Sequence, residues 1–153
     1  MKKLIILLLI SATCYGQNDF LLKNRNTPII DVVVNGVTVN MLIDTGASVN
    51  IINSESVYKF KGAKMYGEKH LVTVGSNTRA NSLRNVEASI KGRAVTDFIA
   101  LDLTSLQCSI QAETRLEIDG IIGVNGIKQL GMIIDLSRGI VTIKNEPNNL
   151  ADK

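Results

Sequence analysis

Apolar and polar residues alternate along most of this chain in short runs separated by turn residues. From Pro28 to Ile43 the alternation continues on both sides of Asn35-Gly36. Asn-Gly accepts the positive φ angles of a type I′ turn, so the pattern predicts a two-stranded hairpin here. Comparable runs recur as far as Ile143. Many short strands with regular turn signals predict an all-β barrel or sandwich.

The other expected elements follow from the same alternation and from the turn residues between the runs. A short helix is expected from Ser54, as its N-cap, to Phe60, and a helical turn at 127–130. The segment 104–115 is polar enough to be a loop. Further strands are expected at 49–52, 71–74, 79–83, 86–90, 95–103, 132–136 and 140–143.

The first sixteen residues have the features of an export signal. Lys2 and Lys3 precede an unbroken apolar run, residues 4–10, which leads to small residues ending at Gly16. The run is much shorter than the roughly 20 residues of a membrane-spanning helix. The prediction is cleavage after Gly16 and a periplasmic or secreted protein without a transmembrane segment. A lipid anchor on Cys14 is the alternative, although Ser11 stands where lipoprotein signals usually carry leucine.

The remaining chain divides into an arm, one domain and a tail. Residues 17–27 form a polar arm, in which Phe20, Leu21 and Leu22 could pack, and residues 145–153 form a polar tail expected to be flexible. The domain occupies residues 28–144. Removing 16 of the 153 residues leaves 137, which is enough for one moderate core but too short for two such lobes.

Composition excludes several classes of function. Without Lys2 and Lys3 the Lys+Arg count falls from 17 to 15, against 14 Asp+Glu, and aromatic residues are 4% of the chain. There is no basic stripe with interleaved aromatics, so nucleic-acid binding is not expected. Cys108, the lone cysteine after cleavage, and His70, the single histidine, make no recognisable zinc site. No metal or cofactor is expected, and Cys108 is interpreted as packed or half-buried.

One carboxylate stands at the end of an apolar run, in Leu42-Ile43-Asp44-Thr45-Gly46-Ala47-Ser48. Burying a charge costs several kcal/mol unless it is compensated. A second apolar run ends in glycine in Asp119-Gly120-Ile121-Ile122-Gly123, and a hairpin about Gly75 lies between the two. With the closing hairpin from Met132 to Ile143, these features resemble the retropepsin-like aspartic proteases, single-lobe relatives of pepsin, and their bacterial exported members. The resemblance covers about residues 28–144.

The resemblance implies a fold and a set of site residues. The fold would be a closed β-barrel lobe with one or two short helices, and Asp44 would be the catalytic residue. The residues expected to support its loop are Thr45, Gly46, Ala47 and Ser48, and those expected to form the structural counterpart loop are Ile121, Ile122 and Gly123. Those at the tip of a flap that closes over an extended peptide are Val74, Gly75, Ser76 and Asn77.

The implied chemistry requires two copies of Asp44. In this family two such carboxylates meet, share a proton and activate a water for attack on a peptide bond. Asp119 lacks the Thr-Gly that follows Asp44, so one chain supplies one such aspartate. The resemblance therefore implies a homodimeric aspartic endopeptidase acting on polypeptides.

Three features depart from the family. Gly75 is the lone glycine of the expected flap tip, whereas retroviral members have glycine-rich flaps. Retroviral members also pair an arginine and an acid where this chain has Val124 and Ser48. Asn125 stands where bacterial relatives often carry aspartate.

Other interpretations of these residues remain open. Asp44 could be a strand-end aspartate satisfied by turn amides, and Asp119 is interpreted as a turn aspartate. The lysines at 59, 61 and 64 are interpreted as a solvated surface. The alternative function is a catalytically silent, exported module for peptide binding or dimerisation on the same fold.

Overall fold

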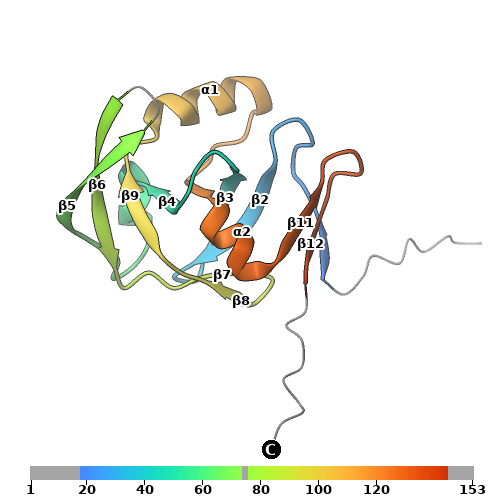
Figure 1. Cartoon of the computed structure of the whole chain (residues 1–153), viewed down its shortest axis with the longest axis horizontal. Coiled ribbons are helices and arrows are strands. Elements are labelled where there is room, and N and C mark those ends of the chain that lie inside the picture. The colour runs from blue at the N-terminus through green and yellow to red at the C-terminus, as the bar shows by residue number, and fades with distance from the viewer. Residues whose placement is uncertain (1–17, 74–75, 145–153) are drawn as a thin grey trace, which may run out of the picture.

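The computed structural model of the chain describes residues 18–73 and 76–144, without the side chains of residues 70–77. The chain is mostly β, with few helices (Figure 1). A nine-stranded sheet has the order β5-β6-β9-β4-β10-β3-β2-β7-β8, and a three-stranded sheet has the order β1-β12-β11. The strands are β1 (Asp19–Leu21), β2 (Ile29–Val34), β3 (Val37–Ile43), β4 (Asn50–Asn53), β5 (Lys64–Thr73), β6 (Ser76–Arg84), β7 (Ala88–Ile90), β8 (Arg93–Val95), β9 (Phe98–Leu101), β10 (Gly120–Ile122), β11 (Met132–Asp135) and β12 (Ile140–Ile143). The helices are η1 (Ser54–Lys59), a 3₁₀ helix, α1 (Thr104–Thr114) and α2 (Val124–Leu130).

The first hairpin is confirmed. Strands β2 and β3 pair with Val34 opposite Val37, and Asn35 and Gly36 have φ angles of 47° and 81° in the turn between them. Alternate side chains of β2 are buried, as the period of two along a strand requires. The buried side of this hairpin faces the main core, and β3 continues directly to Asp44.

The core is formed by apolar side chains from both sheets and from α2. Its fully buried members include Ile30, Val32, Val34, Met41, Ile52, Ile122, Leu130, Val141 and Ile143. Complete burial of one such side chain contributes about 1.5–3 kcal/mol to stability. Two smaller clusters lie under α1, one around Ile110 and Ile118 and one around Leu103 and Ile121. Helix α1 therefore covers strand β10, which carries the second of the two expected loops.

Closure of the barrel is not confirmed. In the part of the chain that the structure describes, neither sheet closes on itself: the larger one ends at β5 and β8, and the smaller one ends at β1 and β11. The three-stranded sheet includes part of the expected N-terminal arm, because Asp19–Leu21 pairs with β12 and Leu22 is buried. The predicted export signal and the tail from residue 145 lie outside the described residues.

Four local predictions were wrong. Residues 104–115 are not a loop, because Thr104–Thr114 is helix α1. The single strand expected at 95–103 is interrupted at Thr96 and Asp97, where the backbone of Asp97 is left-handed with a φ of 62°. The cap of η1 is Asn53, whose side chain accepts from the N–H of Glu55, and not Ser54. Cys108 is exposed on α1.

No helix among the described residues is long and apolar enough to cross a membrane.

Candidate active site

Asp44 is positioned by the pairing of β3 with β10. These two strands run parallel, with Ile122 opposite Ile43, and β10 lies between β3 and β4 in the sheet. The N–H of Asp44 donates to the carbonyl of Ile122 at 3.0 Å, one residue beyond the end of β3. The prediction of a loop at residues 121–123 was wrong in part, because Ile121 and Ile122 belong to strand β10. The counterpart loop is the turn at Gly123 that joins β10 to α2. It neighbours the Asp44 loop, residues 44–48, because their strands are neighbours.

The carboxylate of Asp44 is held by its own loop. Its Oδ1 accepts a hydrogen bond of 2.7 Å from the backbone N–H of Gly46. A Cβ at Gly46 would lie 3.1 Å from the same oxygen, so the absence of a side chain permits this approach. A hydrogen bond to the charged form compensates part of the desolvation of a half-buried carboxylate. The hydrogen bond from Gly46 therefore supplies part of the compensation that a charged side chain at the end of a core strand needs.

The counterpart loop fixes residues 47 and 48 through backbone contacts. Val124 donates its N–H to the carbonyl of Ala47 at 2.8 Å, and Asn125 donates to the carbonyl of Ser48 at 3.2 Å. Gly123 lies so close that a Cβ there would be 2.3 Å from the carbonyl oxygen of Val49 and 2.7 Å from that of Ala47. Glycine is therefore required at residue 123 for the two loops to pack.

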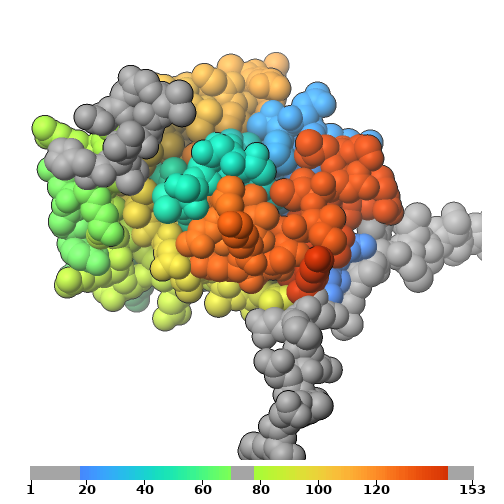
Figure 2. Space-filling view, viewed as in Figure 1, coloured from blue at the N-terminus to red at the C-terminus, as the bar shows by residue number. Residues whose placement is uncertain are grey.

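The loop that carries Asp44 is exposed to solvent on its outer side. Thr45, Gly46 and Ser48 are exposed and Asp44 is half-buried, whereas Ala47 packs on the cluster around Ile121. Figure 2 shows the turquoise segment that follows β3 at the surface, next to α2. The described structure thus brings Asp44–Ser48 together with Ile121, Ile122 and Gly123. Their catalytic and supporting roles stay predictions.

The expected flap falls on the long hairpin of β5 and β6. The strands pair from Lys64 opposite Arg84 to Thr73 opposite Ser76. A register shift occurs between Tyr66 and Glu68. Val74 and Gly75, at the predicted tip, lie outside the described residues, as do the side chains of Ser76 and Asn77. A hairpin is confirmed in this part of the chain, and its role as a flap stays a prediction.

Sequence reasoning missed Asn50, a fully buried amide between the two loops. Its Oδ1 accepts from the N–H of Gly123 at 3.1 Å, and its Nδ2 donates to the carbonyl of Thr96 at 2.7 Å. One side chain thus satisfies two backbone groups that belong to distant segments. The signal was present in the sequence, because Asn50 interrupts an otherwise apolar run at residues 49–52.

Asp119 is not part of the Asp44 loop and is not a simple turn residue. It is buried, and its Oδ1 accepts from the hydroxyl of Ser56 at 2.8 Å and from Nζ of Lys59 at 2.6 Å. Lys59 also forms an ion pair with Glu117 at 3.1 Å. Partial burial alone would lower the pKa of Lys59, but hydrogen bonds and attraction from Asp119 and Glu117 raise it above its usual value. The interpretation of Lys59 as a solvated surface lysine was wrong.

Within residues 18–73 and 76–144, no group of three or more His, Cys, Asp or Glu side chains is placed to hold a metal ion.

Comparisons with known proteins identify the fold and the family. The family model described as aspartyl protease matches residues 30–126. The solved structure of EIAV protease, in complex with the inhibitor HBY-793, is 23% identical with a TM-score of 0.50, and the match covers 69% of this chain and 88% of that one. A retropepsin-like aspartic protease from Rickettsia conorii is 18% identical with a TM-score of 0.51, covering 82% of this chain and 87% of that one. A search of curated proteins finds no match.

Proposed function

Because this chain belongs to the aspartyl protease family and has a retropepsin-like fold, we propose that it is an exported, homodimeric aspartic endopeptidase with Asp44 as its catalytic residue. The observation that carries the proposal is the geometry of Asp44 itself. Its carboxylate is held by the N–H of Gly46 at the surface end of a core strand, in a loop clamped by Gly123 and Val124.

The proposed reaction uses one carboxylate from each protomer. The charged carboxylate takes a proton from a water held between the two, and the water oxygen attacks the carbonyl carbon of the scissile peptide bond. The protonated carboxylate hydrogen-bonds the carbonyl oxygen, and a proton then passes to the leaving amine as the C–N bond breaks. The pH dependence of such a reaction belongs to the pair of carboxylates and not to either one.

A second copy of the chain is needed because the sequence holds one Asp-Thr-Gly motif. Two exposed apolar side chains on the three-stranded sheet support pairing. Leu21 on β1 and Ile133 on β11 are 55% and 50% exposed, and both belong to edge strands of that sheet. The strand register places them on the same face. Among the described residues β1 and β11 are the edges of this sheet, and exposed apolar side chains on edge strands suit a contact with another copy.

The test is cleavage of a diverse peptide mixture by the purified protein, read by mass spectrometry between acid and neutral pH, beside Asp44→Asn. The substitution keeps the size of the side chain and removes its charge. The proposal predicts internal cuts with the wild type and none with Asp44→Asn at equal folded concentration. Cuts that persist in Asp44→Asn, or intact peptides with a dimeric wild type throughout this pH range, would overturn it.

A further inference from the structure

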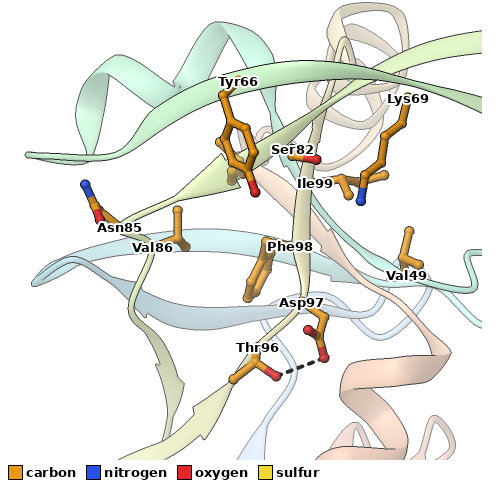
Figure 3. Close-up of a pocket in the computed structure, with 11 residues that line it drawn as sticks. Val49, Tyr66, Lys69, Ser82, Asn85, Val86, Thr96, Asp97, Phe98 and Ile99 are labelled. Atoms are coloured by element: carbon orange, nitrogen blue, oxygen red, sulfur yellow. Dashed lines mark hydrogen bonds between the residues drawn. The ribbon is translucent and has the colours of Figure 1, made fainter.

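A cavity of about 420 Å³ lies between the β5–β6 hairpin and the segment that leads into β9 (Figure 3). Tyr66 and Lys69 reach it from β5, and Asp97 and Phe98 from the opposite side. Val49 also lines the cavity, and it directly follows the loop that carries Asp44. The cavity therefore lies next to the loop that carries Asp44.

The carboxylate of Asp97 is fixed in place by its neighbours. Its Oδ2 accepts from the hydroxyl of Thr96 at 3.0 Å, from Nε2 of Gln129 at 3.1 Å and from Nδ2 of Asn125 at 3.5 Å. Gln129 also accepts from the N–H of Thr96 at 3.0 Å, which ties the turn to α2. In the part of the chain that the structure describes, no protein group donates to Oδ1 of Asp97, and because the residue is exposed this oxygen is open to solvent or to a ligand.

The backbone of this turn also holds the carboxylate of Asp97 in place. Asp97 adopts a left-handed conformation, with a φ of 62°, which L residues rarely occupy outside glycine, asparagine and aspartate. The carbonyl of the preceding Thr96 is held by buried Asn50, which also holds Gly123. A carboxylate on such a braced turn is preorganised, so binding to it loses little conformational entropy.

The chemistry of the lining suits a ligand that carries a cationic side chain with an apolar stem. Val86 and Phe98 give the lining apolar surface, and Oδ1 of Asp97 can accept a charge-assisted hydrogen bond. Lys69 carries a positive charge on the opposite wall, and both Lys69 and Asp97 are exposed. They differ because three hydrogen bonds hold the carboxylate of Asp97, whereas no described hydrogen bond holds the ammonium of Lys69 on its flexible four-carbon stem. The fixed charge in this cavity is therefore negative.

We propose that this cavity is a specificity pocket that selects an arginine or lysine side chain of the polypeptide substrate, and that Asp97 is the residue that makes the selection. The proposal rests on the proposed protease function, because it assumes that a peptide lies beside Asp44. It adds a substrate class, peptides with a basic residue at one fixed distance from the cut.

Binding and cleavage are tested separately, with peptides that carry arginine, methionine or glutamate at each position in turn. Binding is measured on Asp44→Asn protein, which keeps the pocket, and cleavage on protein with Asp44 intact. At one position the arginine peptide should bind, and be cleaved, about tenfold better than the methionine peptide. Adding Asp97→Asn should reduce that ratio to about twofold or less. Glu55→Gln removes an exposed carboxylate that does not line the cavity, and it should keep the ratio.

The proposal is overturned if no position prefers arginine, if the preference survives Asp97→Asn, or if glutamate is preferred, which would assign the selection to Lys69. The two proposals fail in different ways. Binding with an arginine preference but no cleavage would support the pocket and contradict the protease. Cleavage that depends on Asp44 but shows no basic preference would support the protease and contradict the pocket.

Discussion

The side-chain amide of Asn50 donates to the carbonyl of Thr96 at 2.7 Å. The same buried amide accepts from the N–H of Gly123, so it joins the loop that packs against Asp44 to the turn that carries Asp97. Buried backbone groups need partners, and this one side chain serves the buried N–H of Gly123 and the carbonyl of Thr96, whose hydrogen bond is partly buried. The candidate active site and the adjacent cavity thus share one internal support.

Replacing Asn50 tests this support. Asn50→Ala leaves the N–H of Gly123 and the carbonyl of Thr96 without their partner inside the protein. Each unsatisfied buried group costs about 1–3 kcal/mol, so we expect the free energy of unfolding to fall by about 3 kcal/mol, as measured by urea denaturation. Asn40→Ala is the control, because the amide of Asn40 also makes two hydrogen bonds, to the carbonyl of Glu117 and from Nζ of Lys23, but both are exposed to solvent. This variant should lose about 1 kcal/mol or less. Equal losses in the two variants would contradict the assignment.

Gly46→Ala tests whether the N–H of Gly46 positions the carboxylate of Asp44, the proposed catalytic group. The added methyl group would lie 3.1 Å from Oδ1 of Asp44 and displace it by a few tenths of an ångström. Since this glycine has no left-handed backbone, the free energy of unfolding should change by less than about 1 kcal/mol. The kcat/KM for a cleaved peptide should fall about tenfold or more, because small misplacements of reacting groups slow catalysis strongly. Unchanged kcat/KM would show that the contact does not position the carboxylate.

Gly123→Ala tests the packing of the two loops, and its effect should be mainly on stability. The new methyl group would overlap the backbone carbonyls of Val49 and Ala47, which cannot move without shifting β4 and the Asp44 loop. Overpacking of this kind costs about 1–3 kcal/mol and sometimes more, so the midpoint of urea unfolding should fall. Activity should fall as well. A variant as stable as the wild type would mean that the loops are not held as closely as described.

Lys59→Met tests the buried charge of Asp119, whose side chain is 9% exposed. The substitution leaves the carboxylate with the hydroxyl of Ser56 as its described side-chain donor. Loss of one partner of a buried pair is strongly destabilising, and we expect a loss of about 3 kcal/mol at neutral pH. Lys23→Met removes a more exposed lysine that pairs with Asp31, and it should lose less than about 1 kcal/mol.

The stabilisation from Lys59 should depend on pH, and the Lys59→Met variant measures this dependence. Because folding raises the pKa of Lys59, the stabilisation is fully present below the usual lysine value of 10.5 and is lost as the pH rises through the raised value. The difference in unfolding free energy between wild type and Lys59→Met should therefore be constant near neutral pH and narrow above pH 10.5. A difference that narrows toward acid pH instead, with no change at alkaline pH, would contradict the role of Lys59.

The parts of the fold that the sequence predicts are those with local signals. The alternation around Asn35-Gly36 predicts the first hairpin because each strand buries one face. The Asp44 motif and the second apolar run ending at Gly123 predict two loops, and the parallel pairing of their strands explains why the loops meet. These signals depend on neighbouring residues in the chain, so they are visible without a structure.

Other features have weak local signals or none. Ile110 is the one buried residue of helix α1, so the apolar spacing of this segment is too sparse to distinguish a helix from a loop. The left-handed residue Asp97 lies inside an apparently continuous strand pattern. Lys59 and Asp119 are 60 residues apart, and nothing near either residue indicates the pair. Such contacts are set by tertiary packing, which local patterns do not encode.

The central claim is that one active site contains two copies of Asp44, and a mixing experiment tests it most directly. Wild-type protein at fixed concentration is equilibrated with increasing Asp44→Asn protein until subunits have exchanged, and the cleavage rate of one peptide is measured. Mixed dimers hold one aspartate, so random pairing with a tenfold excess of the variant should lower the rate about tenfold. A rate that stays constant after subunit exchange would place the whole active site in one chain and contradict the account.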